Sequence, residues 1–213
     1  MKRSLLAATA VTALVASGCG WSNKAKGGAV GAGAGAAAGA VIGNQTGSTA
    51  RGAVIGAVVG GAAGAVIGHQ MDQQARELAY EIPGATVERI GEGIVVTFPD
   101  GVLFPDNSDQ MLPEARDNMR KFAESLQKYP ETRALVVGHT DARGSAEYNK
   151  DLSERRATAA ASFIAAQGVN RDRITTSGRG EDEPVATNDD AYGQQRNRRV
   201  EVAIFAAQPG GGN

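Results

Sequence analysis

An aspartate and an arginine fifteen residues apart are the side chains in this sequence best suited to chemistry. Asp141 belongs to the run Gly138-His139-Thr140-Asp141-Ala142-Arg143-Gly144, and Arg156 belongs to Leu152-Ser153-Glu154-Arg155-Arg156-Ala157. A carboxylate attracts an ammonium group, and a guanidinium binds a carboxylate through two parallel hydrogen bonds. The pair therefore suits a ligand that carries both charges, a zwitterion.

The elements around this pair predict how it is held. Arg133 to Val137 is an apolar run that predicts a buried strand ending next to Asp141, and α/β sheets commonly bind ligands at strand ends. Arg156 falls on the apolar stripe of a predicted helix that begins after Ser145 and ends near residue 168. A buried guanidinium requires a partner. From spacing alone, a structural ion pair between Asp141 and Arg156 is the simpler interpretation, and a ligand site is the alternative.

The remaining pattern predicts one α/β domain. Strands are expected at residues 85–90 and 93–98 with a turn between them, a helix from Pro113 to about Tyr129, and further strands at 174–177 and 200–205. A further short helix is expected near Tyr192. The fold class is therefore an α/β (α+β) sandwich, a mixed sheet covered by helices on one face.

Two glycine ladders precede this domain. Glycines recur every four residues at 27, 31, 35, 39 and 43, and again at 52, 56, 60, 64 and 68, with the seven residues 37–43 repeated at 62–68. On a helix such glycines form a ridge that lets a second helix approach closely. We expect a Gly-rich helical hairpin, either associated with membrane or with copies of itself, or packed on its own glycines. A flexible spacer is the third interpretation, and seventeen residues reach only about 25 Å, short of a roughly 30 Å hydrocarbon core.

The amino terminus predicts export. Met1-Lys2-Arg3 and the apolar stretch from Leu5 to Val15 have the pattern of a secretory signal. Small residues then lead to Cys19, the only cysteine of the chain. This arrangement resembles a bacterial lipoprotein signal, which implies that Cys19 becomes the new N-terminus and carries lipid; an ordinary cleavage site with a free thiol is the alternative. In a Gram-negative cell, Gly20 in place of a retention aspartate favours the outer membrane.

The motif blocks resemble the OmpA-like peptidoglycan-binding domain family over roughly residues 94–205. The resemblance rests on GHTDARGSAEYNKDLSERRA, on Gly168-Val169 and on the final NRRVEV. It implies that Asp141 binds the ammonium and Arg156 the carboxylate of the diaminopimelate side-chain end in peptidoglycan. It further implies binding roles for Thr140, Asn149 and Asn107, and for Arg198, for which a salt bridge anchoring the last strand is an equal alternative. Together with the ladders, it points to outer-membrane lipoproteins that carry an N-terminal glycine zipper.

Other classes of function find less support in the sequence. His139 is the only histidine outside the ladder region, no metal-ligand cluster accompanies it, and a core histidine is the simpler interpretation. Residues 80–213 hold sixteen basic and twenty-one acidic side chains, which does not suit nucleic acid. We therefore expect neither an enzyme nor a cofactor or metal. A wall-cleaving enzyme with Asp141 and His139 as acid and base remains an alternative, as does a structural assembly driven by the ladders.

These observations predict a modular lipoprotein. A signal peptide at residues 1–18 is followed by a lipidated N-terminus and linker at 19–26, a glycine-zipper hairpin at 27–70 and a connector at 71–84. A peptidoglycan-binding domain occupies 85–208 and a flexible tail 209–213. The predicted function is a non-catalytic tether, anchored by lipid in the outer membrane and binding the cell wall from the periplasm, with homo-oligomers through the ladders as a further expectation.

Overall fold

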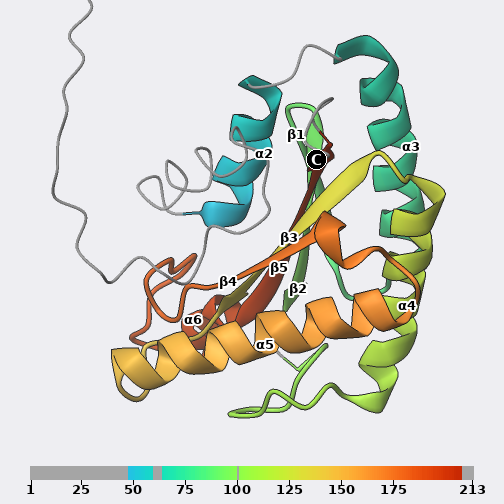
Figure 1. The fold of residues 1–213 in the computed structure, drawn as a ribbon. Helices are drawn as coiled ribbons and strands as arrows, with labels where there is room; N and C mark the ends of the chain where they lie inside the picture. Colours follow the sequence, from blue (N-terminus) through green and yellow to red (C-terminus); the bar gives the residue numbers. More distant parts are fainter. Residues whose placement is uncertain (1–47, 60–63, 100, 208–213) are drawn as a thin grey trace, which may run out of the picture.

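The computed structural model describes residues 48–59, 64–99 and 101–207 (Figure 1). The predicted signal peptide, Cys19, the first glycine ladder and the C-terminal tail lie outside the described residues. Five strands form one sheet: β1 (Thr86–Ile90), β2 (Gly93–Pro99), β3 (Thr132–His139), β4 (Ile174–Gly178) and β5 (Arg199–Ala206). The helical segments are α2 (Thr49–Val59), α3 (Gly64–Glu81), α4 (Pro113–Lys128), α5 (Ala146–Ala166), the 3-10 turn η1 (Arg171–Arg173) and α6 (Ala191–Asn197).

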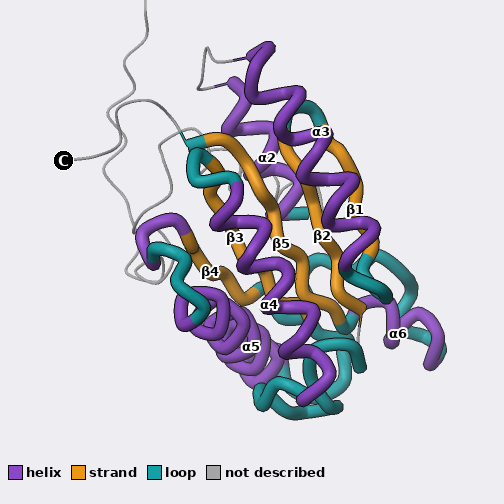
Figure 2. Tube along the Cα trace, turned by 90° about the vertical axis from the view of Figure 1, so that its right-hand side faces the viewer, coloured by secondary structure: helices purple, strands orange, loops and turns teal. Residues whose placement is uncertain are grey.

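The sheet is mixed, as the sequence predicts. Its strand order is β1-β2-β5-β3-β4, which Figure 2 displays from one edge to the other. Only β3 and β4 pair in parallel, with Gly138 opposite Gly178, whereas all the other neighbours are antiparallel. This order places the end of β3 beside the start of β5, where His139 pairs with Arg199. The two motif blocks around residues 141 and 198 therefore meet at one end of the central strands.

Three helices cover the first face of the sheet. Alternate strand residues such as Ile94, Val136 and Val202 point into a core filled from α3, α4 and α5, and Phe98 meets Phe122 of α4 edge-on at 6.2 Å between ring centroids. Helix α3 crosses the boundary expected at residue 70 and contributes buried core residues beyond it. Those residues are Met71, Ala75 and Leu78.

The second face is also covered, which differs from the expected single layer of helices. The intervening strand residues form another apolar cluster, and helix α2 lies on it. Its members are Ala50, Ala53, Val54, Val95, Leu135, Val137, Ala203 and Phe205. The physical reason is that the central strands are apolar at consecutive positions, so both faces of the sheet must be shielded from water. The second glycine ladder, expected as one helix over 52–68, is shared between α2 and α3.

Local signals in the sequence explain the ends of the site-bearing helix. The Ser145 hydroxyl accepts a hydrogen bond from the Tyr148 amide and caps α5, as expected. At the other end Gly168 has φ of +100°, a left-handed conformation that favours glycine after a helix. Helix α4 begins at Pro113 and ends before Tyr129, also as the sequence predicts.

Candidate functional site

Asp141 is a buried carboxylate placed just beyond the end of β3. It is 3% exposed, and the preceding Thr140 donates its amide to the Gly180 carbonyl at 2.8 Å. The carboxylate accepts from Arg198 Nη1 at 2.6 Å, from Arg143 Nε at 2.9 Å and from the Arg143 amide at 3.0 Å. Burial by itself raises the pKa of Asp141, but the hydrogen bonds from Arg198 and Arg143 outweigh it and lower the pKa below its ordinary value. Asp141 is therefore held as an anion.

Arg156 is a buried guanidinium that lies against the loop between β2 and α4. It is 3% exposed on the packed face of α5 and donates from Nε to the Ser108 carbonyl at 2.8 Å and from Nη2 to the Pro105 carbonyl at 2.9 Å. Its guanidinium carbon lies 5.7 Å from the centroid of the Phe104 ring, within the range of a cation–π contact. The loop between β2 and α4 thus orients the guanidinium group.

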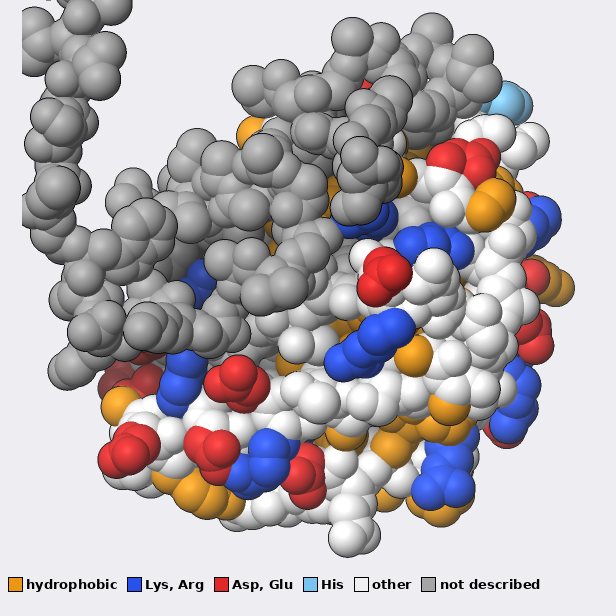
Figure 3. Space-filling model, in the orientation of Figure 1, with side chains coloured by type: hydrophobic (Ala, Val, Ile, Leu, Met, Phe, Trp, Pro, Cys, Tyr) orange, Lys and Arg blue, Asp and Glu red, His pale blue; other side chains and the backbone are white. Residues whose placement is uncertain are grey.

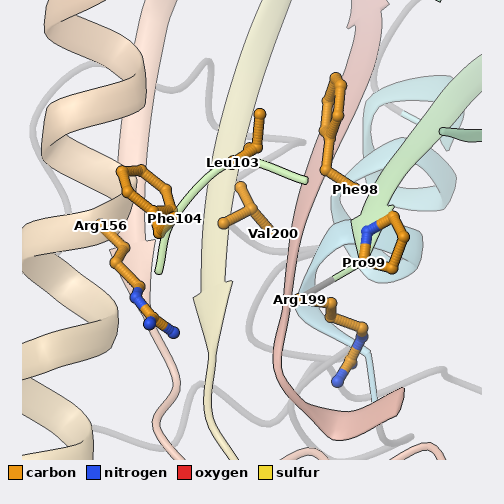
Figure 4. A pocket seen from close by; sticks show the side chains of 7 residues that line it. All are labelled: Phe98, Pro99, Leu103, Phe104, Arg156, Arg199 and Val200. Atoms are coloured by element: carbon orange, nitrogen blue, oxygen red, sulfur yellow. The ribbon is translucent and has the colours of Figure 1, made fainter. Parts of the chain in front are cut away.

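A small pocket opens beside Arg156. Its lining residues come from β2, the following loop, α5 and β5: Phe98, Pro99, Leu103, Phe104, Arg156, Arg199 and Val200. Figure 4 shows the side chains of Arg156 and Arg199 pointing the same way, away from Phe98 and Leu103. Arg156 supplies the cationic part of this pocket, because the Arg199 guanidinium is already paired with Glu201 and with the Asn197 and Glu183 carbonyls. An apolar wall beside one guanidinium suits an anionic group attached to a hydrocarbon chain.

Asn149 connects the helix to the Asp141 loop. It is 2% exposed and donates from Nδ2 to the Asp141 carbonyl at 3.2 Å and to Glu181 Oε2 at 2.5 Å. The Thr140 hydroxyl is buried and has no hydrogen-bond partner within the described residues. The structure thus brings Thr140, Asp141, Asn149 and Arg198 into one cluster. Arg198 makes the salt bridge that was the alternative interpretation of its role, and its partner is Asp141 itself.

Asn107 takes a different position. It lies exposed in the loop whose carbonyls accept from Arg156, and its φ of +52° is a left-handed conformation that asparagine tolerates. The loop is joined to the Asp141 cluster through Arg143, whose Nη2 lies 3.4 Å from Asp106 Oδ2. Asn107 therefore shapes the loop around Arg156, and its side chain is not part of the hydrogen-bonded cluster.

Three contributors were not predicted from the sequence. Arg143, expected only as an added charge at the rim, holds Asp141 through both its backbone and its side chain. Glu181 fixes Asn149, although the acidic run around it suggests a solvated loop. Asn197 of the NRRV block is fully buried and accepts the amides of Val185 and Ala186 at 2.8 and 2.9 Å. The position of Asn197 beside two arginines was the available signal for its role.

His139 is a core residue, as expected. It is 0% exposed and lies with Nδ1 3.9 Å from Glu183 and Nε2 3.9 Å from Glu201. Burial, together with the charges of Arg199 and Arg179, holds the pKa of His139 well below its ordinary value, so the ring is neutral. Within the described residues no group of histidine, cysteine and carboxylate side chains is arranged to hold a metal ion.

The surface of the domain carries mixed charge. Figure 3 shows basic and acidic side chains interspersed over the described part of one face. Exposed ion pairs contribute to this pattern, such as Arg155 with Asp151 and Asp109 on and beside α5. Such a face does not offer the basic stripe that nucleic acid requires. Among the helices of the described ranges, none is both long and apolar enough to cross a membrane.

Sheet order, helix layers and the charged cluster at the strand ends define an OmpA-like α/β domain. Residues 103–198 match the OmpA family and residues 1–72 match the YMGG-like Gly-zipper family. The peptidoglycan-associated lipoprotein of Agrobacterium fabrum is 33% identical over 133 residues, which are 62% of this chain and 75% of that protein. The chain belongs to the OmpA family.

Two further proteins are similar to this chain. The probable lipoprotein YiaD of Escherichia coli (strain K12) is 37% identical over 121 residues, 57% of this chain and 55% of that protein. The match thus spans little more than half the length of that relative. The solved structure of the cell wall anchor of the T6SS from Pseudomonas aeruginosa is 37% identical with a TM-score of 0.57, covering 62% of this chain and 96% of the other.

Proposed function

We propose that this chain is a non-catalytic lipoprotein that tethers the outer membrane to the cell wall by binding the diaminopimelate of peptidoglycan stem peptides. The observation that carries the proposal is a carboxylate and a guanidinium, each 3% exposed. They are linked through the loop between β2 and α4, because Arg143 contacts both Asp141 and Asp106, and Arg156 donates to the carbonyl of Pro105. Support comes from relatives that are named peptidoglycan-associated lipoprotein and cell wall anchor. The ammonium of the zwitterion pairs with Asp141 and its carboxylate with Arg156.

Binding requires an exchange of partners at Asp141. Its carboxylate already accepts from two arginines, and an incoming ammonium must displace one of them. The Arg143 side chain is 52% exposed whereas that of Arg198 is 15% exposed, so Arg143 is the partner more easily displaced into water. Arg198 then remains to orient the carboxylate. Because the bound ligand is held by ion pairs to Asp141 and Arg156, affinity falls as ionic strength rises.

Co-sedimentation of the full-length protein with purified sacculi tests the proposal. The double variant Asp141→Ala, Arg156→Ala is expected to lose pelleting. The matched control Asp117→Ala, Arg120→Ala removes an exposed ion pair from α4 and is expected to pellet as wild type does. Retained pelleting of the Asp141, Arg156 variant would overturn the proposal.

A competition experiment guards against a variant that merely unfolds. Free meso-diaminopimelate is expected to release wild-type protein from sacculi. Cadaverine (1,5-diaminopentane), which keeps both ammonium groups at the same spacing but has no carboxylate, is expected to be much weaker. Equal release by the two compounds would contradict the assignment of Arg156, because only diaminopimelate offers Arg156 a carboxylate.

The anchor is part of the same proposal. Cys19 carries the lipid and the outer membrane holds it, so that the domain reaches the wall from the periplasm. Metabolic labelling with palmitate is expected to mark the wild type and to leave a Cys19→Ser variant unlabelled and in the soluble fraction. An unlabelled wild type would refute the lipid anchor without bearing on the wall-binding site.

A further inference from the structure

Helix α2 is seated on the second face of the sheet by close packing. Ala50, Ala53 and Val54 are all 0% exposed, and they cover apolar strand residues. The fit is tightest at Gly93 of β2, where an added Cβ would lie 2.4 Å from a Val54 methyl group. A side chain at position 93 would therefore push α2 away from the sheet. The seat is as closely fitted as a protein core.

A polar clamp holds the N-terminal end of α2. Buried Glu183 accepts from the Thr49 amide at 3.0 Å and from the Thr49 hydroxyl at 2.5 Å, and that hydroxyl accepts from Arg179 Nε at 2.7 Å. Buried Glu201 accepts from the Ser48 hydroxyl at 3.2 Å. Both carboxylates are at most 4% exposed. If α2 leaves the sheet, these buried charges lose donors and must be solvated again.

The clamp and the candidate wall site share their supports. Three chain segments contribute to both the site and the clamp. In each segment a residue of the site lies one or two positions from a residue of the clamp, or from the histidine within it. The pairs are Asp141 and His139, Glu181 and Glu183, and Arg198 and Arg199. Arg199 joins the segments, because it donates from Nε to Glu201 at 2.8 Å and from Nη2 to the Glu183 carbonyl at 3.1 Å. A movement of residues 179–183 that changes the clamp therefore also changes the site.

We propose that the docking of α2 and the binding of the wall peptide are coupled, so that each stabilises the other. The inference rests on the proposed function. When α2 is docked, Glu183 is fixed, the 179–183 loop is held, and Glu181 keeps Asn149 against the Asp141 loop. When α2 undocks, Glu183 turns toward water and the site loses this support. A segment of the glycine ladder thereby acts as a positioning element for wall binding.

Linkage makes the coupling measurable from both directions. Thr49→Val removes the clamping hydroxyl at nearly constant volume, and we expect the affinity of the full-length protein for meso-diaminopimelate to fall by about fivefold. Thr49→Ser keeps the hydroxyl and is expected to bind nearly as wild type does. Thr158→Val, at an exposed position on α5, is the matched control and is expected to leave affinity unchanged.

The reciprocal measurement uses the wild-type protein alone. Saturating meso-diaminopimelate is expected to slow amide hydrogen exchange within residues 48–59 by about the same factor of five. Amides of α4, which packs on the opposite face of the sheet, provide the internal reference and are expected to slow less. This comparison separates a specific effect on α2 from general stabilisation by a ligand.

Each result has one meaning. If wild type binds but Thr49→Val binds equally well and exchange in α2 does not change more than in α4, the coupling is overturned and the proposed function stands. If Thr49→Val binds more weakly but the ligand does not slow exchange in α2 of the wild type, the variant has only lost stability, and the coupling is again overturned. If Thr49→Val does not fold, the exchange experiment on wild type decides. If wild type binds neither sacculi nor diaminopimelate, the proposed function fails, and the coupling with it.

Discussion

Gly138, the first residue of the GHTD motif, has a steric role that can be tested by a single methyl group. It pairs with Gly178 across β3 and β4, and α5 crosses both strands at this point. A Cβ at position 138 would lie 2.1 Å from the Ser153 carbonyl oxygen, where ordinary contact begins at 3.4 Å. In the Gly138→Ala variant the α5 backbone must therefore retreat by about 1.3 Å, the difference of these two distances.

The expected loss follows from the kind of neighbour. Overpacking of a core typically costs about 1–3 kcal/mol, and the upper end applies because the obstacle is backbone that cannot rotate away. Thermal unfolding of Gly138→Ala is expected about 6–12 °C below wild type, since 1 kcal/mol shifts the midpoint by about 2–4 °C in a protein of this size. Binding to sacculi is expected to weaken as well, because α5 carries Arg156 and Asn149.

The matched control is Gly68→Ala. Gly68 lies within α3 with nothing inside 4 Å of an added Cβ, so the substitution is expected to stabilise the protein by up to about 1 kcal/mol through helix propensity. A destabilisation of Gly138→Ala below about 0.5 kcal/mol would refute the steric argument. A destabilised variant whose folded fraction binds with wild-type affinity would refute the claim that Gly138 sets the position of the binding residues.

Three further outcomes are expected. Sacculus binding should persist below about pH 4, where an ordinary aspartate loses its charge, because the lowered pKa of Asp141 keeps its carboxylate charged. The contribution of Asp141 to stability is likewise present above the unfolded pKa and is lost as the pH falls through the folded pKa. Binding lost already at about pH 6 would contradict this assignment. His139 takes up a proton near pH 6.5 in the unfolded chain, whereas the buried ring of the folded protein does not. The free energy of unfolding should therefore fall below about pH 6.5 by up to about 1.4 kcal/mol per pH unit. A His139→Gln variant with an equally steep pH profile in chemical denaturation would refute that assignment. Val54→Ala should lower the free energy of unfolding by about 1.5–2.5 kcal/mol, because two methyl groups are lost and a cavity is left. Ile55→Ala, at a residue that is 55% exposed, should change it by less than about 0.5 kcal/mol. Equal effects of the two substitutions would contradict the packing of α2 on the sheet.

Much of the domain could be predicted from local signals. Pro113, Ser145 and the turn at Gly91 mark element ends through backbone chemistry that operates within a few residues, and the structure places those ends as expected. The mixed character of the sheet could also be predicted, but the order of its strands could not. Asp141 and Arg156 could be identified as candidate ligand-binding residues because each is a charged residue within or beside an apolar run, and a buried charge requires a partner. The assignment of what they bind stays a prediction.

The partners of Asp141 could not be predicted because they depend on strand order. Arg198 lies fifty-seven residues from Asp141, and only the pairing of β3 with β5 brings the two together. The clamp around Glu183 has the same character, since Thr49 lies 134 residues away. Short-range spacing instead favoured an ion pair with Arg156. Long-range polar contacts thus require the topology before their members can be chosen.

The sequence feature that predicts a helix on the second face of the sheet lies in the strands and not in the glycine ladder. Runs such as Ile94-Val95-Val96 are apolar at every position and imply a sheet covered on both faces, whereas the ladder glycines drew attention to helix–helix packing. Helix α2 turns Ala50, Ala53 and Val54 to the sheet, and Gly52 lies about 200° from Ala50 around the helix axis. The glycine ridge and the sheet-facing stripe therefore occupy different sides of one helix. After Arg51 the residues of α2 are all glycine, alanine, valine or isoleucine, so one helix can carry both the apolar stripe that packs on the sheet and the glycine ridge.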